Sequence, residues 1–66
     1  MQLLVNGETV TANQGDTVAA ILEQLGYSGE TFAVACNGDF VPRGTYDEAR
    51  LKPGDRLDIV APVVGG

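Results

Sequence analysis

Residues 1–12 read MQLLVNGETVTA, a pattern typical of two β-strands joined by a tight turn. Apolar side chains recur at every second position over residues 1–5, the period that places them on one face of a strand. Asn6-Gly7 follows directly. Because both central residues of a type I′ turn need positive φ, an Asn-Gly pair between two strand-like runs is a strong hairpin signal. We therefore expect a β-hairpin whose second strand covers residues 8–12.

A helix is expected after the hairpin, because apolar residues fall at the spacing i, i+3, i+4 and i+7. They form one stripe: Val18, Ile21, Leu22 and Leu25. The expected helix runs from about Thr17 to Leu25, with Asp16 as its N-cap and Gly26 in the left-handed C-cap position. A helix this short is marginal alone, so its stripe must pack against a sheet.

The next element is an unbroken apolar run over residues 32–36, FAVAC. Such a run suits an inner strand that is buried on both faces better than an exposed strand. The small residues Ala33 and Ala35 would share one face of it. Asn37-Gly38 then gives the second hairpin signal of the chain.

A short edge strand is expected at residues 40–41, where Pro42 stops it by removing a backbone donor. Thr45 and Glu48 have the spacing of a capping box. This spacing predicts a single helical or 3₁₀ turn over residues 46–51.

A last strand is expected from Arg56 to Ala61, after a turn at Pro53-Gly54. Its residues alternate between the two faces: Leu57, Ile59 and Ala61 inward, Asp58 and Val60 outward. One helix on one face of a mixed sheet, with a right-handed crossover joining parallel strands, satisfies the connection rules. The sequence therefore predicts an α+β chain with the β-grasp, or ubiquitin-like, fold, a mixed sheet of about five strands and one main helix. Residues 1–61 would form this domain and residues 62–66 a flexible C-terminal Gly-Gly tail.

Composition limits the classes of function. The chain has 66 residues, 44% of them hydrophobic and 20% charged, with a net charge of −5, one cysteine and no histidine. The negative charge would repel nucleic acid and anionic lipid, and it favours a basic protein partner. A single cysteine excludes an internal disulfide, and the absence of histidine removes the usual zinc ligand and general base. With no apolar run of about 20 residues and no signal-peptide pattern, we expect a cytoplasmic protein, monomeric when free.

The chain ends Ala61-Pro62-Val63-Val64-Gly65-Gly66. Two terminal glycines offer a carboxylate with no side chain on either side, which can enter a narrow slot on another protein. Joining this carboxylate to a nucleotide phosphate would create a leaving group that a sulfur or nitrogen nucleophile can displace. Terminal glycines are also common as frayed ends, so the choice between the two interpretations depends on the rest of the chain.

The whole chain resembles the ThiS family of small sulfur carriers in thiamin biosynthesis. The matching features are the opening Met1–Gly7, the segment Ala33-Val34-Ala35-Cys36-Asn37, the run Val41-Pro42-Arg43 followed by Tyr46, Leu51 with Gly54-Asp55, and terminal Gly65-Gly66. Together they are fairly specific in so short a chain, whereas Gly-Gly alone is not.

The resemblance implies that Gly66 carries the chemistry as its own α-carboxylate. In that family an E1-like adenylating enzyme (ThiF-type) uses ATP and magnesium to form the acyl-adenylate. Sulfur that a desulfurase takes from cysteine then replaces AMP, giving a thiocarboxylate that donates sulfur to thiazole synthase (ThiG-type). The chain would therefore be a protein co-substrate, not an enzyme, with no stably bound cofactor or metal.

An apolar strip is expected to bind these partners. It would consist of outward-facing Val60 with Val63 and Val64, and would include Pro62 and Gly65, because exposed apolar patches often mark interaction sites. Pro62 departs from the family pattern, since it stiffens the start of the tail.

Other candidate residues receive weaker interpretations. Cys36 is expected to be a buried small hydrophobe with no chemical role. Arg43 and Tyr46 are as consistent with an ordinary arginine–aromatic contact as with a partner site. Asp55 is assigned to turn formation. Three acidic residues could steer a basic partner or simply be solvated: Asp47, Glu48 and Asp58.

Three alternatives stay open on sequence alone. The chain could carry sulfur for molybdopterin or another metabolite, could be a ubiquitin-like modifier whose Gly66 joins a target lysine, or could be an interaction module with inert glycines. Deleting Gly66 would leave only the module functional.

Overall fold

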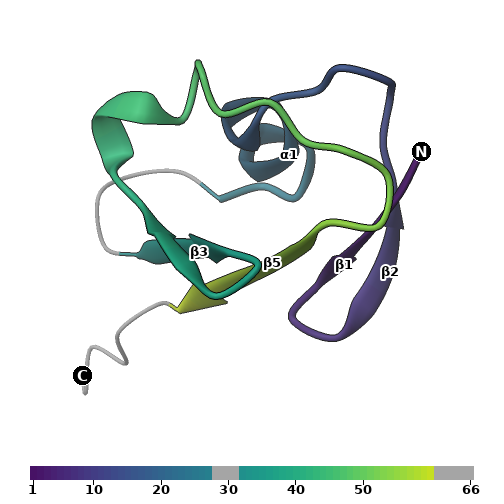
Figure 1. Ribbon diagram of the computed structural model, residues 1–66, viewed down its shortest axis with the longest axis horizontal. Coiled ribbons are helices and arrows are strands. Elements are labelled where there is room, and N and C mark those ends of the chain that lie inside the picture. Colours follow the sequence, from purple (N-terminus) through teal and green to yellow (C-terminus); the bar gives the residue numbers. More distant parts are fainter. Residues whose placement is uncertain (28–31, 61–66) are drawn as a thin grey trace.

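The computed structural model describes residues 1–27 and 32–60, which form a five-stranded mixed sheet with α1 across one face (Figure 1). The strand order is β2-β1-β5-β3-β4, with β1 and β5 parallel and the other pairs antiparallel. The elements are β1 (Gln2–Val5), β2 (Glu8–Thr11), α1 (Val18–Gln24), β3 (Ala33–Cys36), β4 (Asp39–Val41), the 3₁₀ helix η1 (Arg43–Thr45) and β5 (Arg56–Val60). This arrangement confirms the predicted β-grasp fold.

Both Asn-Gly pairs form the predicted turns. Asn6 has φ of 51° and Gly7 has φ of 82°, while Asn37 and Gly38 have φ of 51° and 88°. Positive φ at both central residues is the requirement of a type I′ turn, whose twist matches the flanking strands. The two hairpins, β1-β2 and β3-β4, therefore follow from local sequence.

The start of α1 differs from the prediction. Thr17, not Asp16, is the N-cap: its extended backbone precedes the helix and its hydroxyl accepts from the Ala20 N–H. The Asp16 carboxylate instead accepts from the Asn13 N–H within the preceding turn, at 3.0 Å, so it is not available to the helix. The helix itself begins one residue later and ends one residue earlier than expected.

The end of α1 is the predicted one. Gly26 has φ of 81°, its N–H donates to the Glu23 carbonyl, and the Tyr27 N–H donates to the Leu22 carbonyl. This pair of bonds is a Schellman motif, in which a left-handed residue satisfies the last helical carbonyls.

The core lies between α1 and one face of the sheet. Its members are buried apolar residues from every layer: Leu3, Val5, Ala12, Val18, Ile21, Leu22, Val34, Val41, Leu51, Leu57 and Ile59. The expectation that β3 is buried on both faces was wrong: Val34 is buried, but Ala33 is exposed and Ala35 and Cys36 are half-buried. β3 is an inner strand of the sheet, yet the described helix covers only one face.

The segment after β4 also differs from the prediction. The 3₁₀ helix covers Arg43–Thr45 and so begins before the predicted residues 46–51. The Thr45 hydroxyl donates back to the Pro42 carbonyl at 2.7 Å instead of capping a following turn. The first amide groups of α1 have their acceptors in the segment beyond η1. The Ala19 N–H donates to the Tyr46 carbonyl, and the Val18 N–H donates to the Ala49 carbonyl.

Candidate functional site

Five of the six residues predicted to act or to bind partners lie outside the described residues: Pro62, Val63, Val64, Gly65 and Gly66. The predicted flexible tail falls there too. Val60, the sixth, is the last residue of β5, and its side chain is 65% exposed. Val60 pairs with Ala33 of β3, so the central strand β5 ends beside the start of β3.

The sheet face that α1 does not cover carries an apolar surface around this point. Phe40 is 69% exposed on the edge strand β4 and lies opposite Ala35, which in turn lies opposite Asp58. The small side chains of Ala33 and Ala35 lie between the two large ones of Phe40 and Val60. We call these four residues, Ala33, Ala35, Phe40 and Val60, the exit patch.

Phe40 was missed as a binding residue by sequence reasoning, which placed it only on an edge strand. The available signal was alternation: Val41 is buried, so its neighbour Phe40 must point to the opposite face. A large aromatic residue exposed beside other apolar residues often marks an interaction site.

The other end of β5 is charged. Arg56 and Asp58 form an ion pair on the uncovered face, with Arg56 Nε and Asp58 Oδ2 at 3.8 Å. Both side chains are about half exposed, so the pair adds little to stability and mainly sets the polarity of this part of the sheet. The exit patch is therefore bordered by charge along β5, on the side toward Arg56.

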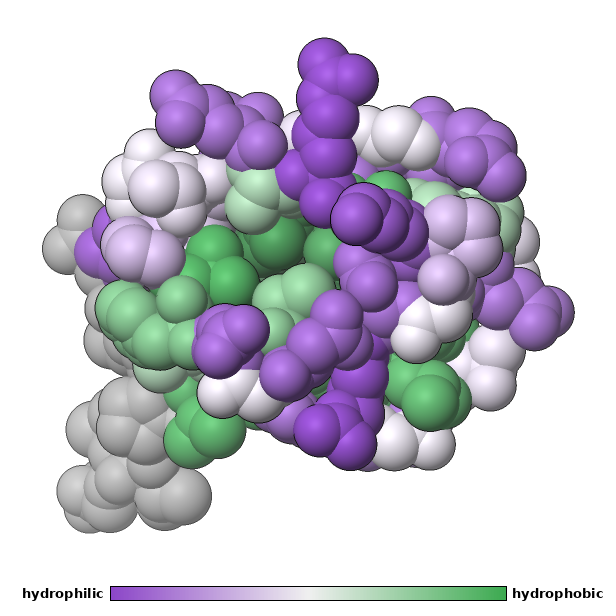
Figure 2. All heavy atoms as spheres, in the orientation of Figure 1, coloured by the Kyte–Doolittle hydropathy of each residue, from purple (hydrophilic) through white to green (hydrophobic). Residues whose placement is uncertain are grey.

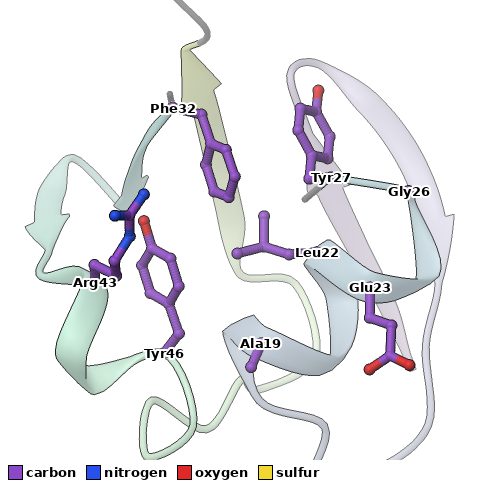
Figure 3. Close-up of a pocket in the computed structure, with 8 residues that line it drawn as sticks. All are labelled: Ala19, Leu22, Glu23, Gly26, Tyr27, Phe32, Arg43 and Tyr46. Atoms are coloured by element: carbon purple, nitrogen blue, oxygen red, sulfur yellow. The ribbon is translucent and has the colours of Figure 1, made fainter. Parts of the chain in front are cut away.

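A second apolar surface lies on the helix side of the sheet, in a groove between α1 and η1 (Figure 3). The space-filling view shows apolar residues at the floor of a hollow, with hydrophilic side chains along much of its rim (Figure 2). The residues lining the groove are Ala19, Leu22, Glu23, Gly26, Tyr27, Phe32, Arg43 and Tyr46. Arg43 and Tyr46 thus lie together in the groove, as the interpretation of an ordinary arginine–aromatic contact required.

Three aromatic rings are in contact within the groove. The planes of Phe32 and Tyr46 are nearly parallel, at 8°, with ring centroids 6.2 Å apart. Tyr27 meets Phe32 edge to face, at 5.5 Å and 61°. Both are favoured arrangements of aromatic pairs, so the rings hold one another in place.

Cys36 is half-buried at the end of β3. Burial raises the pKa of its thiol above the ordinary value of 9.0, and the charges of Asp55 and Asp39 raise it further. Because the thiolate is the reactive form, the thiol is held in its unreactive state at neutral pH. Cys36 is less buried than the sequence predicted, and its lack of a chemical role stays a prediction.

Asp55 has the structural role predicted for it. Its Oδ2 accepts from the Lys52 N–H at 2.8 Å and its Oδ1 accepts from the Asn37 side-chain amide at 3.1 Å. Among the described residues, no group of three His, Cys, Asp or Glu side chains could hold a metal ion. In the same part of the chain, no helix has the length and apolar character that crossing a membrane demands.

Comparison with known proteins begins with a family model. The ThiS family model matches residues 2–66, which is nearly the whole chain. The sulfur carrier protein ThiS of Escherichia coli is 32% identical over 66 residues, and the match covers all of both chains.

Two curated relatives are longer proteins. The chain is 38% identical to the thiazole synthase of Paramagnetospirillum magneticum and 36% identical to that of Magnetococcus marinus, over 66 residues in each case. All of this chain is matched, but it spans only 20% of the length of either relative.

Solved structures of a thiamine biosynthesis protein from Geobacter metallireducens have the same fold. The crystal structure, described as ThiS, matches with a TM-score of 0.81 and 29% identity over all of both chains. The solution structure matches with a TM-score of 0.83 and 30% identity, over all of this chain and 88% of that one.

Proposed function

The chain belongs to the ThiS family, and from this we propose that it is a sulfur carrier protein that serves thiamine biosynthesis. The observation that carries the proposal is the end-to-end match to the Escherichia coli sulfur carrier, with neither chain left over. The same match favours the carrier over an interaction module with inert glycines.

The proposed reactive group is the α-carboxylate of Gly66. A carboxylate oxygen attacks the α-phosphorus of ATP, pyrophosphate leaves, and an acyl-adenylate forms on the active site of an E1-like partner that holds magnesium. A sulfur nucleophile supplied by a desulfurase then attacks the acyl carbon. The acyl C–O bond breaks, AMP leaves, and a C–S bond forms in its place. Where the sulfur arrives as a persulfide, a thiol then attacks the S–S bond, which breaks to release the thiocarboxylate and leave a disulfide.

The described part of the chain supports a co-substrate instead of an enzyme. Its thiol, Cys36, has a raised pKa and lies on β3. Asp16 and Asp55 take part in turns, and Asp58 forms a surface ion pair. These groups are suited to building a stable support for the tail. We therefore propose that the partners supply the nucleotide site, the metal and the bases.

We propose thiazole synthase as the protein that receives the sulfur. Two thiazole synthases contain a region similar to this whole chain within a polypeptide about five times as long. A carrier joined covalently to its acceptor gains a high effective concentration, which explains why the two would be fused. The chain would deliver its sulfur to an acceptor of this kind.

We propose that the exit patch is where partners dock. It surrounds the point at which β5 ends, so a protein bound there could take up the following residues directly. The patch contains one exposed aromatic side chain, Phe40, and aromatic residues are enriched in interfaces.

The test is the intact mass of the protein after incubation with a family adenylating enzyme, Mg-ATP, cysteine and a desulfurase. A gain of about 16 Da, from exchange of one oxygen for sulfur at the acyl centre, is expected. A chain lacking Gly66 is the matched control and should gain nothing. The starting mass also shows whether Gly66 is the C-terminal residue of the native protein.

Two results would overturn the proposal. Loss of this mass gain together with higher-mass conjugates on lysines would identify a ubiquitin-like modifier. An equal gain in the Gly66-deleted chain would place the sulfur on another group.

A further inference from the structure

The groove between α1 and η1 has no part in the proposed sulfur transfer, and we propose that it binds a small heteroaromatic anion. An anionic thiazole is the member of this class that the proposed function would supply, and that choice rests on the proposed function. The groove itself is argued from its size, its rings and its charges.

The size of the groove suits a small molecule. Its volume is about 380 Å³, at the lower end of the range of roughly 300–1,000 Å³ that ligand pockets occupy. Ala19 of α1 and Gly26, which follows that helix, both line the groove and bring little or no side-chain volume to it. A single ring with short substituents fits such a space better than a peptide does.

The rings offer a stacking surface. The faces of Phe32 and Tyr46 are nearly parallel, and Tyr27 stands at an angle to Phe32 on the other side (Figure 3). A planar ring entering beside them can stack on one face and meet the edge of another. A ring sulfur adds a polarisable contact with aromatic edges.

Charge sets the sign and the orientation of the ligand. Arg43 and Glu23 lie on opposite sides of the groove, with the guanidinium beside the phenol of Tyr46 (Figure 3). A guanidinium has five N–H donors and can hold a carboxylate or phosphate through two of them while it keeps other contacts. The anionic group would therefore lie at the η1 side, with the ring over Phe32.

The groove and the exit patch lie on opposite faces of the sheet, and β3 connects them. Phe32 directly precedes Ala33, which pairs with Val60 at the end of β5. A ligand against Phe32 therefore lies next to the strand that borders the exit patch. Such a site would let an aromatic product of the acceptor enzyme bind its own sulfur carrier.

The experiment titrates a methylthiazole carboxylate into the isotope-labelled full chain and follows amide and aromatic resonances. Saturable shifts are expected at Tyr27, Phe32 and Tyr46. Neutral methylthiazole should bind at least about tenfold more weakly, because it forfeits the charge-assisted hydrogen bonds. Equal binding of the two probes, or shifts that do not saturate, would overturn the proposal.

Two arginine variants test the assignment of Arg43. Both Arg43 and Arg56 are exposed, so Arg43→Gln and Arg56→Gln remove the same charge without touching the core. Arg43→Gln is expected to weaken binding about tenfold or more, and Arg56→Gln about twofold or less. An equal loss in the two variants would show attraction by net charge alone and would refute the site.

This test is independent of the sulfur chemistry, because no partner enzyme is present. Binding without any mass gain in the adenylation experiment would support the groove and refute the carrier function. A mass gain with no binding would support the carrier function and refute the groove as a binding site.

Discussion

The side-chain oxygen of Asn6 accepts a 2.7 Å hydrogen bond from the backbone N–H of Ile59, a residue 53 positions away. Asn6 is the first central residue of the β1-β2 turn, and Ile59 belongs to the central strand β5. The Asn6 N–H also donates to the Leu57 carbonyl, at 2.9 Å. One turn residue thus continues the parallel β1-β5 ladder beyond the end of β1 and supports the strand that leads into the tail.

Replacing Asn6 tests this relationship. Asn6→Ala leaves the Ile59 N–H without its acceptor and places an alanine at positive φ, so the free energy of unfolding should fall by about 1–3 kcal/mol. Asn6→Asp keeps an acceptor at the same place and should stay within about 1 kcal/mol of the native chain. Urea unfolding measures both, and equal losses would show that the hydrogen bond contributes nothing.

Asn37 occupies the matching place in the second hairpin but has a different partner. Its side-chain amide donates to Asp55 Oδ1 at 3.1 Å, while its own oxygen accepts from the Arg56 N–H at 3.0 Å. Asn37→Asp would set two carboxylates against each other, so we expect a loss of about 1–2 kcal/mol at pH 7. The same change at Asn6 is the control.

The loss in Asn37→Asp should depend on pH. The introduced carboxyl ionises less readily in the folded chain, because it faces a like charge there. The unfolded chain therefore ionises first as pH rises, so the deficit is present at neutral pH and shrinks between about pH 7 and pH 4. Unfolding curves of both Asp variants over this range check it. A deficit that does not change with pH would exclude the repulsion.

Alanine substitutions at Gly26 and Gly44 distinguish the effect of backbone strain from the effect of crowding. A Cβ added at either position would meet nothing within 4 Å, but only Gly26 has positive φ, at 81°. Gly26→Ala should therefore lower the free energy of unfolding by about 1 kcal/mol or more, whereas Gly44→Ala should have little effect or stabilise slightly. Equal thermal shifts in the two variants would mean that the end of α1 tolerates a right-handed residue.

Cys36 makes stability depend on alkaline pH. Burial raises the pKa of its thiol above 9.0, with smaller contributions from Asp55 and Asp39. The unfolded chain therefore ionises first as pH rises, so the stabilisation is complete below the unfolded pKa and is lost towards the folded pKa. The difference in unfolding free energy between the native chain and Cys36→Ala should be constant to about pH 8 and fall above pH 9. If the stability curves of the native chain and Cys36→Ala stayed parallel up to about pH 10.5, this prediction would be wrong.

Phe40 tests the exit patch without disturbing the core. Phe40→Ser removes a 69% exposed side chain, so the free energy of unfolding should change by less than about 1 kcal/mol. Formation of the thiocarboxylate should slow at least about tenfold, because aromatic anchors carry much of an interface's energy. Thr9→Ser, on the uncovered face of β2, is the control and should leave the rate unchanged. An unchanged rate in Phe40→Ser would move docking elsewhere.

The sequence alone predicted the elements whose causes are local. Asn-Gly pairs fix the two hairpin turns through their φ angles, and Gly26 ends α1. The apolar stripe gave the buried side of that helix for three of its four members, whereas Leu25 lies at the C-cap and is 37% exposed. Alternation along β5 likewise assigned Leu57 and Ile59 to the core and Val60 to the surface. These features depend on residues within a few positions of one another, so the chain's own order displays them.

Only the tertiary structure decided the features that join distant segments. The first amides of α1 donate to the carbonyls of Tyr46 and Ala49, which belong to a segment far along the chain. The exit patch and the aromatic groove each gather residues from separate elements. Their existence depends on strand order and helix position, and one-sided covering of the sheet is also what left Ala33 exposed. Such contacts form between residues whose separation along the chain carries no periodic signal, so packing of the whole domain determines them.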